Sequence, residues 1–550
     1  MSTPAPVAPQ FVTHEVTNQA PPLVYDAWST DLPLREAITR EGGGWHEGAL
    51  QKYGTRVGGE LMAAGFLANE NKPKFRPFDR YGNRLDEVEF HPSYHQLMGA
   101  AIDVGVTHFG WSQAATKGAH VARMALSYLH NQADQGTSCP LTMTYAVVPA
   151  LKHSPELARV WLPRVTSNRY DSRFLPADQK TGVTMGMGMT EKQGGSDVRT
   201  NTTKAYRNGD TYELVGHKWF FSAPMCDAFL VLAQAEGGIT CFLLPRWKAD
   251  GTRNAVRIQR LKDKLGDWSN ASSEVEFQGA QVWRVGDEGR GVATILEMVA
   301  LTRQDCMIGS SSLMRQALVQ AIHHTRHRVA FGKKLIDQPL MKNVLADLAL
   351  ESEAHTALTA RIARAVDGSS RGDEKEAAFA RMGTAIGKYW VCKRAAVFVN
   401  EAQECLGGAG YVEEANLARL YRQAPLNSIW EGSGNIQCLD VLRAAMKEPA
   451  SLQAVFAEVK SAQGSNAHLD TEMAKLVNDF GDPATIEVRA RGLVERLALC
   501  LQASILIRAG NAAVSDAFCE SRLGGQHGAA FGTLNAKAPF EALINRAFPS

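Results

Sequence analysis

The periodicity of the chain changes twice, and these two changes set the architecture. From about 30 to 175 apolar residues recur with helical spacing, and Pro- and Gly-containing stretches around 71–92 and 134–141 break the helices. The block from 181 to about 285 contains short strand-like runs instead. Inside that block an Asn-Gly pair at 208–209 separates two runs, which is a hairpin signal. Helical spacing then returns. The sequence therefore predicts an α+β protein, mainly α, with a small β-barrel in the middle.

The helical part beyond the barrel divides further. Two long apolar stripes are joined by a polar stretch at 366–375, and such a pair of helices suggests a bundle. After Pro449 a last helical segment begins, with breaks at 481–483 and 524–532. A chain of 550 residues needs several cores. We expect an N-terminal extension and helical domain (1–180), a β-barrel domain (181–285), a helix-bundle domain (286–445) and an extra helical domain (446–550).

Composition argues against several classes of protein. A net charge of +2 gives no support to whole-chain attraction toward nucleic acid or an anionic membrane. The nine cysteines form no CxxC pair, which disfavours a disulfide scaffold and a zinc ribbon. No apolar run approaches the ~20 residues of a membrane helix, and the Pro-rich start lacks the features of a signal peptide. We expect a cytoplasmic protein.

Three stretches carry side chains that packing alone does not explain. The loop at 187–197 (Met-Gly-Met-Thr-Glu-Lys-Gln-Gly-Gly-Ser-Asp) can bring amides and hydroxyls to a planar ligand or a phosphate. The strand at 217–222 (His-Lys-Trp-Phe-Phe-Ser) can lay an aromatic ring against a ring system. At 427–435 (Asn-Ser-Ile-Trp-Glu-Gly-Ser-Gly-Asn) apolar neighbours would raise the pKa of Glu431, as a base needs. Taken singly, the loop at 187–197 is also compatible with a surface turn, the strand at 217–222 with an aromatic run in the core, and Glu431 with an exposed loop glutamate.

Other familiar signals are incomplete. The Gly-Met-Gly at 186–188 is a fragment of a dinucleotide-binding loop, and no phosphate-binding loop ending in Lys-Ser/Thr is present. Nicotinamide and ATP are therefore disfavoured. His323 and His327 stand one helical turn apart beside His324, but no HExxH pattern supports a metal site. We expect solvated histidines and no metal.

Taken together and in this order, the three stretches resemble the acyl-CoA dehydrogenase family. The motif at 328–332 (Arg-Val-Ala-Phe-Gly) is similar to the family's Arg-x-x-Phe-Gly element, and 405–411 to its Gly-Gly-x-Gly-Tyr loop. The resemblance covers roughly 90–445. It implies FAD as the cofactor, an acyl-CoA or related substrate, and a homotetramer in which Arg328 contacts the FAD pyrophosphate of a neighbouring subunit.

The resemblance assigns roles residue by residue. Glu431 would remove the α-proton of an acyl-CoA thioester, while the β-hydrogen leaves as hydride to the flavin. The strand and the loop at 187–197 would hold the isoalloxazine, and 432–435 would line the nucleotide side. Trp430 and Arg443 would line the substrate channel, although Arg443 is equally compatible with a structural ion pair. The predicted cofactor-binding residues are Met187, Gly188, Met189, Thr190, Gly195, Ser196, Trp219, Phe220, Phe221, Ser222, Arg328, Phe331, Gly407, Gly408, Ile429, Trp430, Gly432, Ser433, Gly434 and Asn435.

Two positions depart from the family pattern. Glu404 stands where many members carry Gln before the Gly-Gly pair, which puts that cofactor contact in doubt. Trp430 replaces the smaller or phenolic residue usual before the base, which would narrow the acyl channel.

Within the family, the motifs are most similar to a bacterial alkylation-response subfamily, over most of the chain including its last segment. That resemblance implies binding to double-stranded DNA, protection against alkylation and weak dehydrogenase activity. The candidate DNA-binding residues are Arg489, Arg491, Arg496, Arg508 and Arg522. Yet 446–550 holds ten Lys/Arg against eleven Asp/Glu, so charge alone favours a solvated helix face.

Two alternatives stay open at this point. One is a metabolic acyl-CoA dehydrogenase whose extra domain serves only oligomerisation. The other is a flavin oxidase of a non-CoA substrate, because a base beside a flavin can serve any acidic C–H.

Overall fold

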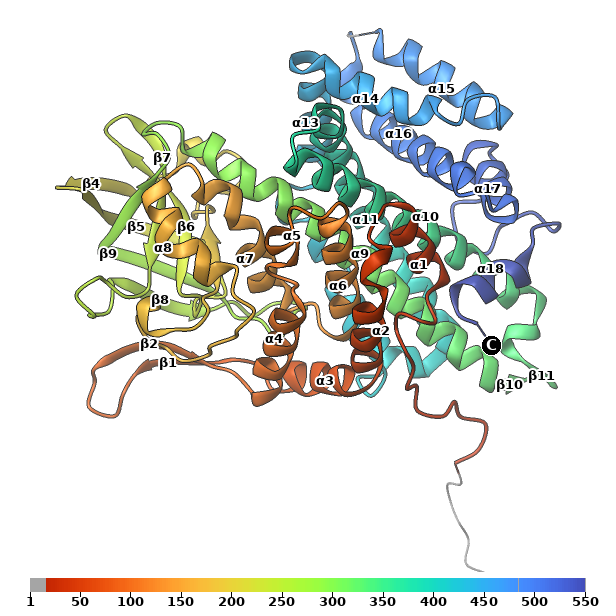
Figure 1. Ribbon diagram of the computed structural model, residues 1–550. Coiled ribbons are helices and arrows are strands. Elements are labelled where there is room, and N and C mark those ends of the chain that lie inside the picture. Colours follow the sequence, from red (N-terminus) through yellow and green to blue (C-terminus); the bar gives the residue numbers. More distant parts are fainter. Residues whose placement is uncertain (1–15, 483, 550) are drawn as a thin grey trace, which may run out of the picture.

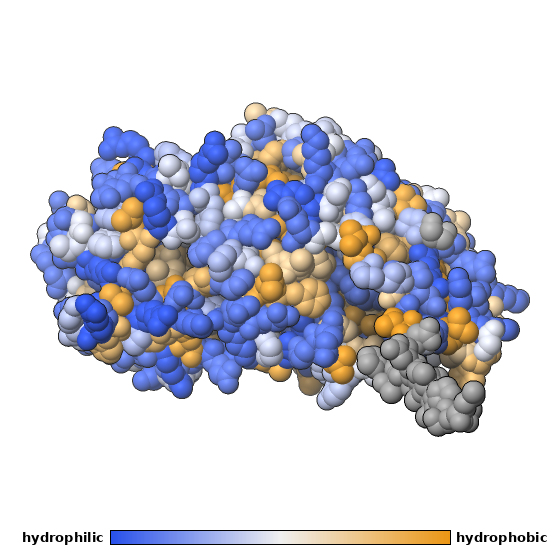
Figure 2. All heavy atoms as spheres, turned by 90° about the horizontal axis from the view of Figure 1, so that it is seen from below, coloured by the Kyte–Doolittle hydropathy of each residue, from blue (hydrophilic) through white to orange (hydrophobic). Residues whose placement is uncertain are grey.

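The computed structural model describes residues 16–482 and 484–549. The Pro-rich start discussed above lies outside this part of the chain. As Figure 1 shows, the barrel occupies one end of the molecule, and helices α14 to α17 the opposite, upper end. The face in Figure 2 is largely hydrophilic, with separate apolar patches. No described helix combines the length and apolar character that crossing a membrane requires.

The N-terminal helices pack around a core of their own, as their periodicity predicts. Asp31 caps the first helix, and its carboxylate accepts from the Leu34 amide at 3.0 Å. We predicted only helix breaks at 71–92, but the chain forms a two-stranded hairpin there. The elements are α1 (Leu32–Arg40), α2 (Glu47–Arg56), α3 (Met62–Glu70), β1 (Lys74–Phe78), β2 (Arg84–Glu89), α4 (Pro92–Val104), α5 (Phe109–Ser112), α6 (Ala119–Ala133), α7 (Ser138–Leu151) and α8 (Pro155–Val165).

The middle block forms a closed barrel. Its strands are β3 (Met185–Gly188), β4 (Lys204–Asn208), β5 (Thr211–Ser222), β6 (Ala228–Ala235), β7 (Gly238–Pro245), β8 (Val256–Leu261) and β9 (Ser272–Val285). The predicted hairpin joins β4 to β5, with Gly209 in the left-handed region (φ 62°). The ring runs from β5 to β9, β7, β6 and back to β4, while β3 pairs with β6 and β8 with β9. The barrel interior is apolar.

Three long helices form the bundle beyond the barrel. They are α9 (Gly291–His327), α10 (Pro339–Ser370) and α11 (Glu374–Leu406), and they are followed by α12 (Asn416–Gln423) and α13 (Gly434–Lys447). A short hairpin of β10 (Val329–Ala330) and β11 (Lys333–Lys334) follows α9. The predicted connection at 366–375 is mostly helical, because α10 continues to Ser370. There Asp367 accepts from the amides of Gly118 and His120, at 2.9 and 3.1 Å.

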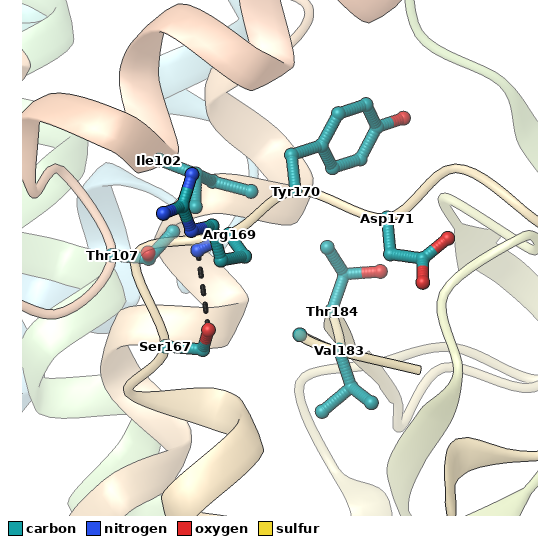
Figure 3. Close-up of a pocket in the computed structure, with 9 residues that line it drawn as sticks. Ile102, Thr107, Ser167, Arg169, Tyr170, Asp171, Val183 and Thr184 are labelled. Carbon is teal, nitrogen blue, oxygen red and sulfur yellow. Dashed lines mark hydrogen bonds between the residues drawn. The ribbon is translucent and has the colours of Figure 1, made fainter. Parts of the chain in front are cut away.

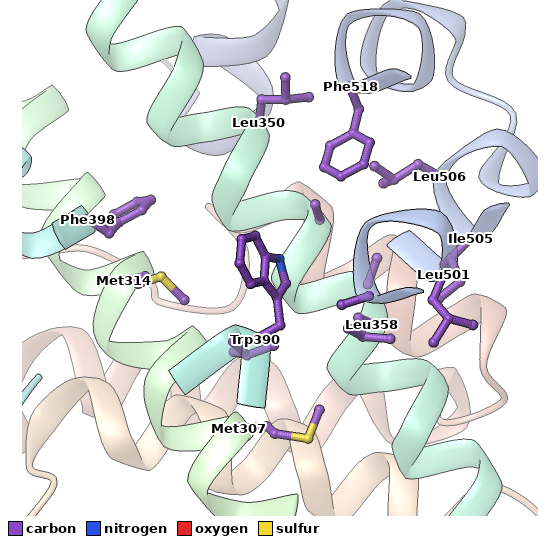
Figure 4. Close-up of a cluster of buried hydrophobic side chains, with 14 of the residues drawn as sticks. Met307, Met314, Leu350, Leu358, Trp390, Phe398, Leu501, Ile505, Leu506 and Phe518 are labelled. Atoms are coloured by element: carbon purple, nitrogen blue, oxygen red, sulfur yellow. The ribbon is translucent and has the colours of Figure 1, made fainter. Parts of the chain in front are cut away.

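The last segment shares its hydrophobic core with the bundle. Its helices are α14 (Pro449–Lys460), α15 (Ala467–Phe480), α16 (Ile486–Ala509), α17 (Ala512–Phe518) and α18 (Phe540–Ala547). Figure 4 shows Trp390 of α11 among side chains of α10, α16 and α17, such as Leu358, Leu501 and Phe518. Its indole N–H donates to Gln502 Oε1 at 3.1 Å. The predicted boundary at 445 between the bundle and the last segment therefore runs through one continuous core, and it stays a proposal.

Candidate active site

The segment that carries Glu431 is held in an unusual conformation. It links a short turn at Leu426–Ser428 to α13, and both Glu431 (φ 59°) and Gly432 (φ 96°) are left-handed. That region is unfavourable for a residue with a Cβ, so Glu431 needs support from its surroundings. The support comes from donors to its carbonyl: Arg303 Nε at 2.9 Å and Gln437 Nε2 at 3.1 Å.

The carboxylate of Glu431 is partly buried and has one hydrogen-bond donor among the described residues. Thr302 on α9 donates its hydroxyl to Oε2 at 2.7 Å. Burial raises the pKa of Glu431 above its usual range, although Thr302 and the charges of Arg303 and Lys388 act in the opposite direction. A raised pKa suits a group that must accept a proton near neutral pH.

The loop at 187–197 is anchored by a buried ion pair. Glu191 accepts from Lys218 Nζ at 2.8 Å, and both side chains are fully buried. The Thr202 amide donates to the same carboxylate at 2.7 Å. Burial opposes ionisation of Glu191, but Lys218 and the neighbouring amides lower its pKa below the usual range. The pair escaped our sequence analysis, although Tyr212, Leu214 and Lys218 follow the inward alternation of a strand.

The loop lies directly against β5. Thr190 accepts from the Trp219 amide at 2.8 Å, which fixes the loop beside the aromatic run. A Cβ on Gly195 would come within 2.3 Å of Thr190 Oγ1, so a side chain there would displace the loop. Ser196 is exposed, whereas Met189 and Thr190 are half-buried. These groups form a polar cradle at the rim of the barrel.

A register shift in β5 separates the aromatic residues. It falls between Lys218 and Phe221, so that Lys218 and Phe221 are buried while Trp219 is half-buried and Phe220 exposed. Lys262 Nζ lies 3.5 Å from the centre of the Trp219 ring. Trp219, Phe220 and the half-buried Ser222 are thus accessible to a ligand.

Three of the predicted cofactor-binding residues lie in the barrel core. Phe221 is fully buried and packs against Phe229, with ring centres 4.2 Å apart. Met187 and Gly188 are buried on β3, and a Cβ on Gly188 would lie 2.7 Å from the Phe221 ring. The side chains of Met187 and Phe221 are thus buried, and the cofactor-binding roles of all three residues stay predictions.

The Glu431 loop lies against the core of the barrel domain. Cys139 at the start of α7 is buried, and burial raises the pKa of its thiol to about 12. A hydrogen bond to the Ser222 side chain acts in the opposite direction, and the charge of Glu431 raises it further. Trp430 also packs against the barrel core, and its indole donates to Asn427 Oδ1 at 2.9 Å.

The remaining predicted residues after Glu431 lie at the start of α13. Ile429, Ser433 and Asn435 are exposed, and a Cβ on Gly434 would lie 3.4 Å from the Tyr389 ring. Arg443 is exposed farther along the same helix.

The residues predicted to act across a subunit boundary lie elsewhere. Arg328 and Phe331 sit on the β10–β11 hairpin, which Figure 1 places beside α18 and away from α13. Phe331 is 98% exposed. Gly407 and Gly408 lie in the turn at Gly407–Tyr411, where Tyr411 is 86% exposed. One chain does not bring these residues to Glu431.

The arginines of the last segment are mostly paired with carboxylates. Arg489 lies 3.5 Å from Asp482, Arg496 pairs with Asp479 at 2.5 Å, and Arg508 pairs with Glu458. Arg522 is buried between Asp347 and Glu351, at 2.5 and 2.9 Å. Its burial and its two ion pairs argue against the predicted contact with DNA. Arg491 differs, since its hydrogen bond goes to the Tyr389 hydroxyl at 3.4 Å.

Two other features lie apart from this region. The prediction of solvated histidines on α9 is wrong for His324, which is buried. His323 Nε2 lies 2.7 Å from the Pro21 carbonyl, and His327 Nδ1 lies 2.8 Å from the His323 carbonyl. Within 16–482 and 484–549 no three His, Cys, Asp or Glu residues are grouped as metal ligands. Figure 3 shows a narrow cleft lined by Tyr170, Asp171 and Thr184. It leaves no room for a water molecule and shares no residue with the predicted site.

The sequence resembles known protein families over most of its length. The sequence matches three family profiles: "Adaptive response protein AidB N-terminal domain" over 18–172, "Acyl-CoA dehydrogenase, middle domain" over 186–280, and "Acyl-CoA dehydrogenase, C-terminal domain" over 289–446.

Relatives match over most of the chain. It is 47% identical to the AidB protein of Escherichia coli (strain K12), over 93% of this chain and 94% of that protein. It is 32% identical to acyl-CoA dehydrogenase family member 11 of Caenorhabditis elegans, over 78% and 71% of the two chains. The structure of Caenorhabditis elegans ACDH-11 in complex with C11-CoA superposes with a TM-score of 0.84 at 26% identity, covering 98% of this chain and 93% of that chain.

Proposed function

Because this chain belongs to the acyl-CoA dehydrogenase family, as an AidB-like, FAD-dependent oxidoreductase, we propose that it oxidises an acyl-CoA thioester with Glu431 as the base. The observation that carries the proposal is the environment of Glu431. A partly buried carboxylate with a raised pKa is held in a strained, clamped loop that packs against the barrel core through Trp430.

The residues at the barrel rim fit FAD. The cradle of Thr190, Gly195 and Ser196 offers hydroxyls and a close backbone approach, and Trp219 and Ser222 are accessible beside it. We propose that these five residues hold the isoalloxazine and that Gly432, Ser433 and Asn435 line the nucleotide side. FAD supplies the hydride acceptor of the family's chemistry.

Glu431 performs the proton transfer in this proposal. Its Oε1 is free of hydrogen bonds among the described residues, while Oε2 is held by Thr302. The free oxygen would take the α-proton of the thioester, and the clamped carbonyls would keep the carboxylate in place during the transfer. Trp430 beside it would limit the width of the acyl channel, with Arg443 farther along α13.

The test is anaerobic reduction of the bound flavin by acyl-CoAs, starting with C11-CoA because the related ACDH-11 structure holds it. Glu431→Gln should retain FAD and lose flavin reduction by at least about 100-fold, the contribution expected of a general base. Glu374→Gln, an exposed glutamate on α11, is the matched control. Full reduction by Glu431→Gln would refute the assignment. Reduction by a non-CoA substrate alone, such as a nitroalkane, would favour the oxidase alternative.

DNA binding with protection against alkylation is the second candidate, and the similarity to AidB supports it. The ion pairs of Arg489, Arg496 and Arg508 argue against a cationic face, so we rank it below the oxidoreductase. A salt series of duplex DNA binding tests it, with Arg491→Gln against Lys375→Gln. Loss of one phosphate contact should reduce the salt slope by about one. If duplex DNA does not bind even at low salt, the DNA-binding function is refuted and the metabolic acyl-CoA dehydrogenase is favoured.

We further propose a cytoplasmic homotetramer. The exposed aromatic rings of Phe331 and Tyr411 support a partner surface at the β10–β11 hairpin and the Gly-Gly turn. The nine cysteines are free and buried, which agrees with a reducing compartment. Light scattering of the wild type and of Phe331→Ser tests the assembly, and a monomeric wild type would contradict it.

A further inference from the structure

Lys388 reaches the Glu431 loop from the side of α11. It is 1% exposed, and its Nζ donates to the carbonyls of Trp430 at 2.8 Å and Gly432 at 2.6 Å. These two carbonyls flank Glu431. Because Arg303 and Gln437 hold the carbonyl of Glu431 itself, three successive carbonyls of the loop have side-chain donors.

The charge of Lys388 has no carboxylate partner at ion-pair distance in the described part of the chain. The other cation beside Glu431 is different. Arg303 pairs with Asp440 at 2.9 Å, and Asp440 also binds Arg381 at 3.0 Å. A buried ammonium is unfavourable unless a negative group compensates it, and carbonyl dipoles do so only in part.

Glu431 is the negative group that remains for this role. The groups that face it are Thr302, Arg303 and Cys306 on α9, Lys388 on α11 and Cys139 on α7. Both thiols are buried, and burial raises their pKa values, so they carry no charge near neutral pH. Lys388 is thus the one cation in this set without a carboxylate of its own.

We propose that Lys388 is a positioning residue of the active site, which fixes the left-handed loop and adds its positive charge to that of Arg303 to keep Glu431 ionised between turnovers. Two bonds from one ammonium tie Trp430 to Gly432 and so restrict the backbone on both sides of Glu431. The same ammonium favours the carboxylate over the carboxylic acid. The inference rests on the proposed function only where it names Glu431 as the base.

The test measures the protonation of Glu431 directly, by infrared spectroscopy of the FAD-loaded protein across a pH series. The band of the protonated Glu431 carboxyl is identified by its absence in Glu431→Gln. In Lys388→Met the midpoint of this band should rise by about one pH unit or more, a tenfold change in the ionisation constant per unit. Lys375→Met, the same change at an exposed position of α11, should leave it unchanged. Equal midpoints in the wild type and Lys388→Met would overturn the proposal.

A second variant covers the outcome in which Lys388→Met does not fold, as judged by circular dichroism. Lys388→Gln keeps an N–H donor but removes the charge, so a raised midpoint supports the proposal and an unchanged midpoint overturns it. The acidic limb of flavin reduction by C11-CoA should move with the midpoint. If no acyl-CoA reduces the wild-type flavin, the proposed function fails, but the infrared titration still decides the role of Lys388.

Discussion

Replacing Lys218 by methionine should lower the unfolding free energy, because it removes the cation that compensates the buried Glu191 in the loop at 187–197. The two side chains are fully buried and 2.8 Å apart. Removing one partner of a buried ion pair leaves an uncompensated charge and typically costs about 3–5 kcal/mol of unfolding free energy. Glu191 keeps donors in the amides of Thr202 and Thr203, at 2.7 and 3.2 Å. We therefore expect the lower end, about 3 kcal/mol.

The double variant Lys218→Met with Glu191→Gln separates the ion pair from the packing. Both charges are then absent, and a pair replaced as a whole is often nearly neutral in stability. The double variant should therefore recover at least half of the loss. Urea unfolding followed by circular dichroism measures both values, and the flavin retained after dialysis reports the state of the loop.

The pH dependence of stability should also change sign. In the wild type Lys218 and the amides lower the pKa of Glu191, so this group stabilises the fold above the ordinary carboxyl range and loses that effect as pH falls. In Lys218→Met, burial should dominate and raise the pKa of Glu191 above its unfolded value. The variant should therefore lose stability as pH rises through the raised pKa of Glu191. Equal losses in the single and double variants, with no change of sign, would refute the reasoning.

Three further variants test other parts of the structure. Thr302→Val removes a 2.7 Å hydrogen bond to the Glu431 carboxylate. A hydrogen bond to a charged group is worth about 1.5–3 kcal/mol, so the midpoint of the acidic limb of flavin reduction should rise by about one to two pH units. An unchanged midpoint would show that Thr302 does not determine the pKa of Glu431. Phe221→Ala should cost about 3–5 kcal/mol in urea unfolding as a buried ring of the barrel core, and a loss below 1 kcal/mol would contradict that placement. Arg522→Met should destabilise by about 3 kcal/mol, the lower end for a broken buried ion pair, because Asp347 keeps His527 and Glu351 keeps Arg394 as partners, while duplex DNA affinity stays unchanged. A selective loss of DNA binding would restore its earlier assignment.

Much of the architecture could be predicted because the signals are local. The Asn-Gly pair at 208–209 specifies a tight turn whatever surrounds it, and the change from helical to alternating spacing marks the barrel. The hairpin at 71–92 was missed because Pro77 and Gly82 look like helix breaks, whereas Pro77 lies within β1 and Gly82 lies in the turn between β1 and β2.

The support of the predicted site could not be predicted in the same way. Lys388 lies 42 residues from Trp430, and Thr302 lies 129 residues from Glu431. No local sequence pattern predicts either hydrogen bond, because a threonine or a lysine on a buried helix face can bond to many different partners. The burial of Phe221 could not be predicted for a related reason: an aromatic run does not reveal which ring points inward until the register shift in β5 is known.

The core that α16 and α17 share with α10 and α11 makes the last hundred residues part of one cooperative folding unit with the bundle. Calorimetry should record a single transition for both regions, because neither can melt without exposing the other's apolar surface. A chain ended near 445 would expose Trp390 and its neighbours, so that truncation measures misfolding as much as lost function. By the same reasoning, the segment cannot be exchanged between relatives as a cassette: its apolar face and that of the bundle have to change together.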